Sequence, residues 1–219
     1  MQTASDSVRL PEGYVKLNYV EATGSQYIIT DYIPTLDKPS KIIADFQYTV
    51  KRESGTGRLF GKANNTTNRG SFQFGLDGTN NAWFFFRSSG MANLGQQNAG
   101  IRFGNPDLER HIFCFEYQKS VTVDGISYEE TLEQASYHDW RGDNTKGNEF
   151  AIFATQRGGE LYSGSEASAK LYSLKLYEGD ELVRDFVPAQ NTYTGEIGLF
   201  EVVLGNFFVN GTSTPLLGG

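Results

Sequence analysis

The feature that most constrains the fold is an alternation of apolar and polar residues near the C-terminus. Over residues 169–187 two such runs flank Gly179-Asp180, a pair typical of a tight turn between antiparallel strands. In the first run the alternation predicts three side chains on one apolar face, namely Tyr172, Leu174 and Leu176. A second pair of runs follows at 195–204 and 207–211. A chain with consecutive hairpins is predicted to be all-β. Residues 128–137 alone fit a short helix, and a β-turn explains that stretch equally well.

The composition supports short strands joined by tight turns within one domain. The 219 residues include 16 Phe, 12 Tyr and 25 Gly; aromatic residues favour strands, and glycine suits reversals. No change in composition marks a second domain, and a chain of this length can bury a sizeable core as one unit. We therefore expect an N-terminal arm at 1–10, one domain at 11–212 and a C-terminal tail at 213–219.

Charge and cysteine content exclude several classes of protein. The formal net charge is -7 and no basic stripe is present, so we expect no nucleic-acid partner. No apolar run approaches the roughly 20 residues that span a bilayer, so we expect no membrane insertion. Residues 1–10 lack the pattern of a secretory signal. Cys114 is the single cysteine, and its place among aromatic residues predicts a small apolar filler in a strand.

The middle of the chain continues the strand pattern. The cleanest alternation runs from 41 to 50, where five residues are predicted to share one face: Ile42, Ala44, Phe46, Tyr48 and Val50. Further strands are predicted at 14–20, 26–30, 58–62, 71–76, 82–87, 111–118, 120–123 and 150–155. About a dozen short strands at this spacing predict a two-sheet antiparallel β-sandwich or a barrel.

Residues 110–125 resemble a strand pair of the concanavalin A-like lectin/glucanase (laminin G-like) domains. In that family an aromatic-alternating strand turns into one that ends in Val-Asp-Gly, which is Val123-Asp124-Gly125 here. Residues 60–62 and 171–177 match where the family's other core strands fall. The resemblance implies an all-β fold, a two-sheet antiparallel β-sandwich with the concanavalin A-like jelly-roll arrangement. The Asp-Gly pair also suits a hairpin turn with positive φ.

The chain as a whole is similar to a module of gut bacterial surface proteins and of phage tail, fibre and decoration proteins. This similarity covers residues 10 to 211 or so, and four segments mark the two ends of the fold: 10–14, 21–28, 182–188 and 195–200. These are motifs of the scaffold. One of them includes Arg184, which lies two residues before Phe186 in a predicted strand. Alternation along the strand therefore points its cation toward the same, apolar face as Phe186. A half-buried arginine requires a carboxylate, which by strand parity is not Asp185.

Glycoside hydrolases occur on the same fold, but the sequence lacks their acids. They need two carboxylates about 5 to 9.5 Å apart, which on one strand face means acids two or four residues apart. The glucanase pattern Glu-x-Asp-x-x-Glu is absent. His111 and His138 are the only histidines, and no Gly-x-Ser-x-Gly elbow accompanies them. We therefore predict a non-catalytic protein, with a hydrolase as the outside alternative.

Three polar loops, at 64–69, 77–83 and 137–144, have the side chains that sugar recognition uses. Amides and carboxylates pair with sugar hydroxyls, while an aromatic ring stacks on the C–H face of the sugar. The alternative is that Asn, Asp and Gly simply form turns, and that Trp83 packs inside. The candidate ligand-binding residues are Asn64, Asn68, Asp77, Asn80, Asn81, Trp140, Arg141 and Asn144.

Calcium is the candidate cofactor. Four residues supply the oxygen ligands that Ca²⁺ takes, namely Asp139, Asp143, Asn148 and Glu149, although their spacing matches no EF-hand loop. The resemblance adds that such domains often hold one calcium at a sheet rim. Residues 141–143 spell the integrin-recognition tripeptide Arg-Gly-Asp, which a chance match explains better.

These observations lead to an adhesion hypothesis. We expect a non-catalytic adhesion or decoration module at a phage virion surface, as a fibre, tail or head-decoration protein. We expect it to bind a host-surface carbohydrate or receptor. Its further expected partners are other virion or cell-surface protein subunits and further copies of itself in a homo-oligomer. The alternative is a gut bacterial cell-surface lectin or carbohydrate-binding module. A purely structural decoration protein is the third class.

Overall fold

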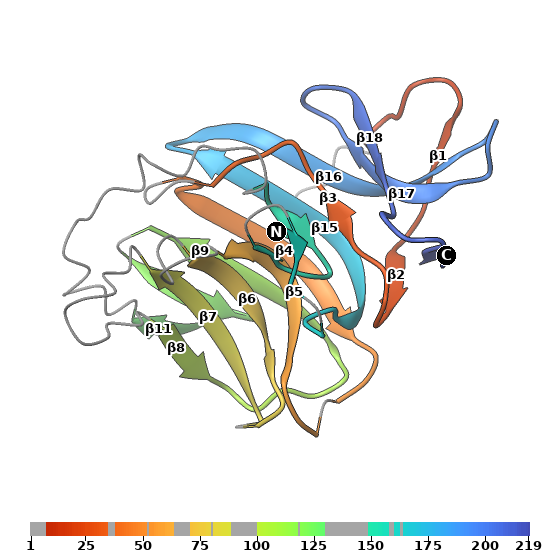
Figure 1. The fold of residues 1–219 in the computed structure, drawn as a ribbon. Helices are drawn as coiled ribbons and strands as arrows, with labels where there is room; N and C mark the ends of the chain where they lie inside the picture. Colours follow the sequence, from red (N-terminus) through yellow and green to blue (C-terminus); the bar gives the residue numbers. More distant parts are fainter. Residues whose placement is uncertain are drawn as a thin grey trace.

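The computed structural model describes most of the chain, namely residues 8–34, 38–51, 53–63, 71–79, 81–88, 100–117, 119–129, 149–157, 160–162 and 164–219. Within these ranges the protein is all-β, without an α-helix. Its strands form two sheets that pack face to face as a sandwich (Figure 1). The predicted fold class is thus confirmed at the level of an all-β antiparallel sandwich.

The larger sheet contains eleven of the described strands. They are β1 (Tyr14–Lys16), β2 (Val20–Thr23), β4 (Lys41–Tyr48), β9 (Arg110–Glu116), β10 (Ser120–Val123), β11 (Ile126–Glu129), β15 (Ser168–Glu178), β16 (Glu181–Asn191), β17 (Ile197–Glu201), β18 (Asn206–Val209) and β19 (Leu217–Gly218). The main path runs β11-β10-β9-β4-β15-β16-β17-β18, while β1 pairs with β16 and β2 pairs with both β15 and β19.

The smaller sheet contains eight of the described strands. They are β3 (Ile28–Ile29), β5 (Thr56–Ala63), β6 (Ser71–Asp77), β7 (Ala82–Ser88), β8 (Gly100–Phe103), β12 (Ala151–Ile152), β13 (Gln156–Arg157) and β14 (Glu160–Leu161). The path runs β14-β13-β5-β6-β7-β8, and β12 lies between β5 and β3. Every strand pair described in the two sheets is antiparallel except that of β13 with β5.

Aromatic rings fill the space between the sheets. Phe46 of β4 lies 5.4 Å from Phe74 of β6, and Phe113 of β9 lies 4.1 Å from the same ring, measured between ring centroids. All three side chains are fully buried. Trp83 is 2% exposed and contacts Phe46 and Phe74, so the interpretation of Trp83 as a core residue is confirmed. This packing holds β4 and β9 against β6 and β7.

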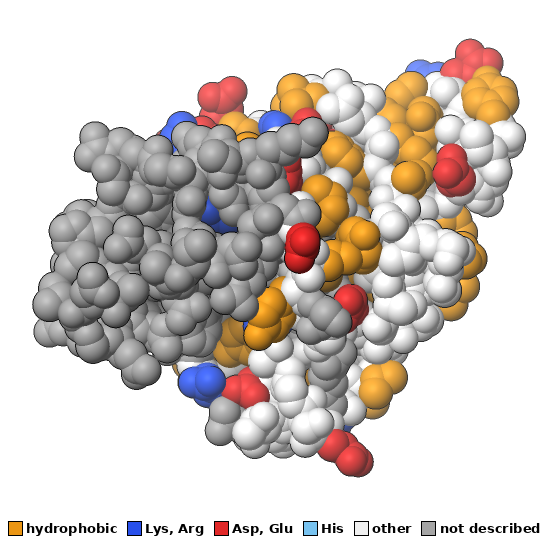
Figure 2. Space-filling model, in the orientation of Figure 1, with side chains coloured by type: hydrophobic (Ala, Val, Ile, Leu, Met, Phe, Trp, Pro, Cys, Tyr) orange, Lys and Arg blue, Asp and Glu red, His pale blue; other side chains and the backbone are white. Residues whose placement is uncertain are grey.

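A second hydrophobic cluster lies on the opposite side of β16 and β17. Val187, Ala189 and Phe200 form its buried part, and Leu10 and Tyr14 pack against it. The residues just before β1 therefore cover the outside of the larger sheet at one end. Hydrophobic side chains also reach the surface around β1 and β18, at the upper right of Figure 2.

The predicted alternation in β4 is confirmed up to the end of the strand. Ile42, Ala44, Phe46 and Tyr48 are buried. Val50 lies beyond the strand and is 54% exposed, so its predicted place on the buried face is wrong. The alternation of the sequence continues beyond Tyr48, the last residue of β4. Outside the strand, pairing no longer fixes the direction of a side chain.

The C-terminal hairpins are confirmed, with one correction of facing. β15 and β16 flank a turn at Gly179-Asp180, and the register shifts between Leu171 and Ser173. This bulge adds one residue, so Leu171 is buried and Tyr172 is turned to the outer face. The prediction that Tyr172 shares the buried face with Leu174 and Leu176 is therefore wrong.

The hairpin of β10 and β11 has the predicted turn. Asp124 has φ 51° and Gly125 has φ 79°, the left-handed conformations that a two-residue hairpin turn of this type requires. Cys114 of β9 is half-buried on the outer face of the larger sheet and lies outside the interior between the sheets. Burial raises the pKa of its thiol.

Candidate functional site

Most of the predicted binding and metal residues lie outside the described ranges. They are Asn64, Asn68, Asn80, Asp139, Trp140, Arg141, Asp143, Asn144 and Asn148. The structure describes Asp77, Asn81 and Glu149. Of these, Glu149 is half-buried just before Phe150, far in the chain from the other two. No group of three or more metal-ligating side chains occurs among the described residues.

Asp77 and Asn81 shape the turn between β6 and β7. Asp77 is 4% exposed; its Oδ1 accepts a hydrogen bond from the backbone N–H of Thr79 at 3.0 Å, and its Oδ2 accepts one from Arg102 Nε at 2.8 Å. Asn81 has φ 48°, a left-handed conformation that asparagine tolerates. The Asp77 carboxylate therefore fixes the turn and links it to β8, and Asn81 has a backbone conformation suited to a turn.

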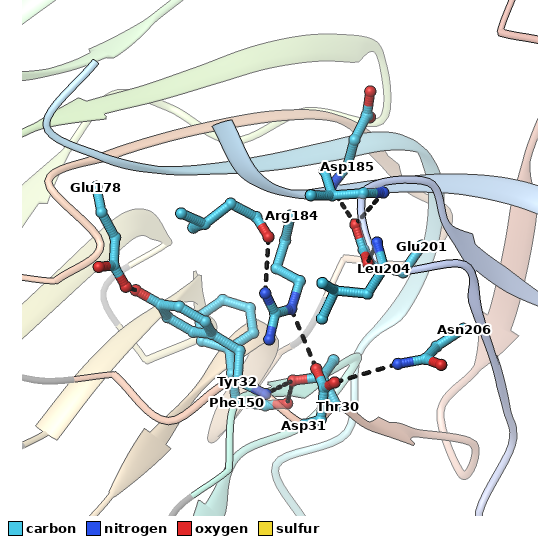
Figure 3. Close-up of polar contacts among 12 residues, drawn as sticks. Thr30, Asp31, Tyr32, Phe150, Glu178, Arg184, Asp185, Glu201, Leu204 and Asn206 are labelled. Carbon is cyan, nitrogen blue, oxygen red and sulfur yellow. Dashed lines mark hydrogen bonds and ion pairs between the residues drawn. The ribbon is translucent and has the colours of Figure 1, made fainter. Parts of the chain in front are cut away.

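Arg184 pairs with the carboxylate of Asp31, which lies in the loop after β3. Its Nε donates to Asp31 Oδ1 at 3.1 Å, and its Nη1 donates to the carbonyl of Val183 at 2.7 Å (Figure 3). Arg184 lies opposite the buried Leu176 in the ladder and is 15% exposed. The prediction of a half-buried arginine paired with a carboxylate other than Asp185 is confirmed.

The contacts around Arg184 tie four segments together. Tyr32 donates from its hydroxyl to Glu178 Oε1 at 3.2 Å, and Lys38 Nζ lies 2.6 Å from Glu178 Oε2. Asn206 at the start of β18 donates to Asp31 Oδ2 at 3.4 Å. Because each of these polar groups has a partner within the protein, this cluster holds the loop after β3 against β15, β16 and β18.

A polar hollow of about 260 Å³ lies at one end of the larger sheet. It is formed by the start of β4, the end of β9 with the residues after it, and the turn between β15 and β16. Its lining residues are Ser40, Lys41, Glu116, Tyr117, Lys119, Gly179 and Asp180. The lining combines two carboxylates, two amines and an aromatic side chain.

The carboxylate of Glu116 lies between the two lysines of the hollow. Lys41 Nζ is 3.0 Å from Oε1, and Lys119 Nζ is 2.9 Å from Oε2. Hydrogen bonds from Lys119 and Lys41 lower the pKa of Glu116, and the bond to Glu116 raises the pKa of Lys41. Glu116 and Lys41 therefore keep their charges at neutral pH, and each has hydrogen-bonding capacity to spare.

The amino-acid sequence does not indicate this hollow. Lys41 and Glu116 each occupy outward positions of separate strand patterns, where charged residues are ordinary. They become neighbours because β4 and β9 pair in a register that places Lys41 opposite Glu116. The pattern of a single strand contains no signal for such a long-range pair.

A histidine bridges two carboxylates at the other end of β9. His111 Nδ1 lies 2.6 Å from Asp124 Oδ2, and His111 Nε2 lies 2.7 Å from Asp107 Oδ1. Burial lowers the pKa of His111, but the hydrogen bonds to Asp124 and Asp107 outweigh it, and the pKa is raised above the ordinary 6.5. Both contacts are favourable only in the imidazolium, since neutral imidazole has one N–H donor.

This bridge predicts that stability falls as the solution becomes alkaline. The raised pKa of His111 adds stability that is complete below about pH 6.5 and is lost as pH rises through the folded-state value. The hydrogen bond from His111 lowers the pKa of Asp107, so stability is also lost as pH falls below about 3.8. Urea unfolding across this range should give a pH slope that His111→Gln reduces. Equal slopes for the two proteins would contradict the bridge.

Comparison with known proteins assigns no family. No protein-family model matches the sequence, and no curated protein matches it significantly. Within the described part of the chain, no helix is both long enough and apolar enough to cross a membrane.

Proposed function

We propose that this chain is a non-catalytic adhesion or decoration module that binds a neutral glycan in the hollow beside Glu116. Its sandwich would have the concanavalin A-like jelly-roll arrangement that residues 110–125 resemble. The proposed setting is the surface of a phage virion, with a gut bacterial surface lectin as the alternative. The glycan would belong to the host surface that the module contacts.

The single observation behind this proposal is the Glu116 carboxylate held between Lys41 and Lys119 in an open polar hollow. Sugar hydroxyls donate to carboxylates and accept from amines, and the half-buried ring of Tyr117 adds an apolar surface. Two lysines and two acids, Glu116 and Asp180, leave the lining without net charge. This balance favours an uncharged polar ligand over an anion.

The first test is a glycan-array screen of the purified chain, with calcium and again with chelator. We expect binding to neutral glycans that Glu116→Gln or Lys119→Ala weakens about tenfold, the loss expected for one charge-assisted hydrogen bond. The matched control is Glu12→Gln, an exposed acid before β1. Dependence on calcium would support the predicted calcium ligands.

Three results would contradict the proposal. Folded protein that binds no glycan would favour a structural decoration protein whose partners are other virion subunits. Binding that Glu116→Gln and Glu12→Gln leave equally intact would place the glycan elsewhere. Release of sugars from a polysaccharide would make the protein a hydrolase.

A further inference from the structure

The hollow is one end of a longer surface on the outside of the larger sheet. Along β9 the outward positions are Glu116, Cys114, Ile112 and Arg110, and along β4 they are Lys41, Ile43, Asp45 and Gln47. The register places these two rows side by side, since Lys41 faces Glu116 and Gln47 faces Arg110. Six residues of β4 at about 3.4 Å each separate the two ends by about 20 Å.

The far end of this surface is an ordered cluster of tyrosine and arginine. Arg110 forms two hydrogen bonds of 2.7 Å to the carboxylate of Asp45, and its Cζ lies 3.8 Å from the ring centroid of Tyr172. The hydroxyl of Tyr172 donates to Gln47 Oε1 at 2.7 Å. The bond to Asp45 raises the pKa of Arg110. These contacts hold the ring and the guanidinium in place before any ligand arrives.

A second tyrosine extends the cluster. Tyr19 lies edge-on to Tyr172, with ring centroids 5.9 Å apart, and Lys170 Nζ lies 4.2 Å from the Tyr19 ring. Tyr172 reaches the outer face only because of the bulge in β15. Without that extra residue the ring would point into the core, so the bulge is what creates an aromatic end on this surface.

The surface between the two ends is apolar at its centre. Ile112 is 51% exposed, and it lies in a row with the half-buried Ile43 and Cys114. The cations alongside are paired: Lys175 with Asp185 at 2.6 Å, and Arg110 with Asp45 at 2.7 Å. The surface therefore has polar, charge-balanced ends and an apolar middle.

We propose that an extended neutral oligosaccharide lies along β4 and β9, from the hollow at Glu116 to the ring of Tyr172. This inference rests on the proposed function, and it adds the class of ligand: a polymer chain bound along its length, in place of one terminal sugar. Sugar chains present C–H faces along their middle and hydroxyls at their edges, which matches the apolar row and the polar groups beside it. The paired charges disfavour a polyanion.

The test measures affinity against chain length. Monosaccharides and successively longer oligomers of the neutral cello-, xylo- and malto- series are titrated calorimetrically into the intact chain. We expect affinity to rise with the length of the oligomer until the oligomer spans the distance of about 20 Å between the two ends of the surface. Tyr172→Ala should weaken binding of the longest oligomer about tenfold and leave the monosaccharide unchanged, because only the long chain reaches the ring. Tyr193→Ala, a 78% exposed tyrosine in the turn after β16, is the matched control.

Each other outcome overturns the inference in a recognisable way. Equal affinity for short and long chains, or equal effects of Tyr172→Ala and Tyr193→Ala, would leave the hollow as a site for a single sugar. The absence of any binding would contradict the proposed function itself. A dimer that Tyr172→Ala dissociates in sedimentation would assign the surface to a second copy. If Tyr172→Ala fails to fold, Arg110→Gln removes the guanidinium packed on the Tyr172 ring and is judged by the same length dependence.

Discussion

Replacing Phe74 with alanine is expected to lower the free energy of unfolding by about 3–5 kcal/mol. Phe74 of β6 is fully buried between the sheets. Its ring contacts five other rings with centroids 4.1 to 6.5 Å away, namely those of Phe46, Phe60, Trp83, Phe103 and Phe113. Truncation removes these contacts and leaves a cavity that rigid strands on both sides cannot close. Urea unfolding followed by circular dichroism measures the loss.

The control for this prediction comes from the second cluster. Phe207 of β18 is half-buried and contacts Tyr14 outside the space between the sheets, so Phe207→Ala should cost clearly less than Phe74→Ala. Equal costs would mean that the aromatic layer between the sheets is not the main core. A cost below about 1 kcal/mol for Phe74→Ala would contradict face-to-face packing at this point.

The fold was predictable wherever the information is local. Alternation with period two requires only neighbouring residues, and it identified β4 and the β15–β16 hairpin. Turn chemistry is equally local, and the left-handed conformations of Asp124 and Gly125 follow from their identities. The outward direction of Tyr172 was not predictable, because one bulge residue reverses which face of the sheet the preceding residues of the strand occupy. No residue type in this strand marks the bulge.

The candidate site depended on long-range pairing, which a single sequence does not show. Asp77 was selected for its loop composition, but its side chain accepts hydrogen bonds from Thr79 in the turn and from Arg102 of β8. The hollow arises from the register of β4 against β9, which places Lys41 opposite Glu116. The need of Arg184 for a carboxylate was predictable from strand parity, but its identity as Asp31 depends on how the loop after β3 crosses the sheet.

Replacing Glu201 with alanine is expected to cost about 3 kcal/mol, because it removes a charged acceptor from three backbone donors. Glu201 at the end of β17 is fully buried. Its Oε1 accepts from the N–H groups of Asp185 and Val203, each at 2.9 Å, and its Oε2 accepts from that of Leu204 at 2.7 Å (Figure 3). The carboxylate thus fixes the β17–β18 turn against β16. Urea unfolding measures the overall loss.

Hydrogen exchange distinguishes the loss of these bonds from a general loosening of the sheet. In Glu201→Ala the amides of Asp185, Val203 and Leu204 should exchange faster than the fall in global stability explains, since their acceptor is gone. Glu201→Gln keeps an oxygen for Asp185 but turns an amide donor toward Leu204, so its cost should be intermediate. Glu196→Ala, at an exposed acid in the preceding turn, should stay within about 0.5 kcal/mol of the parent. Unchanged exchange at all three amides would show that the turn is held by its own backbone instead of by this carboxylate.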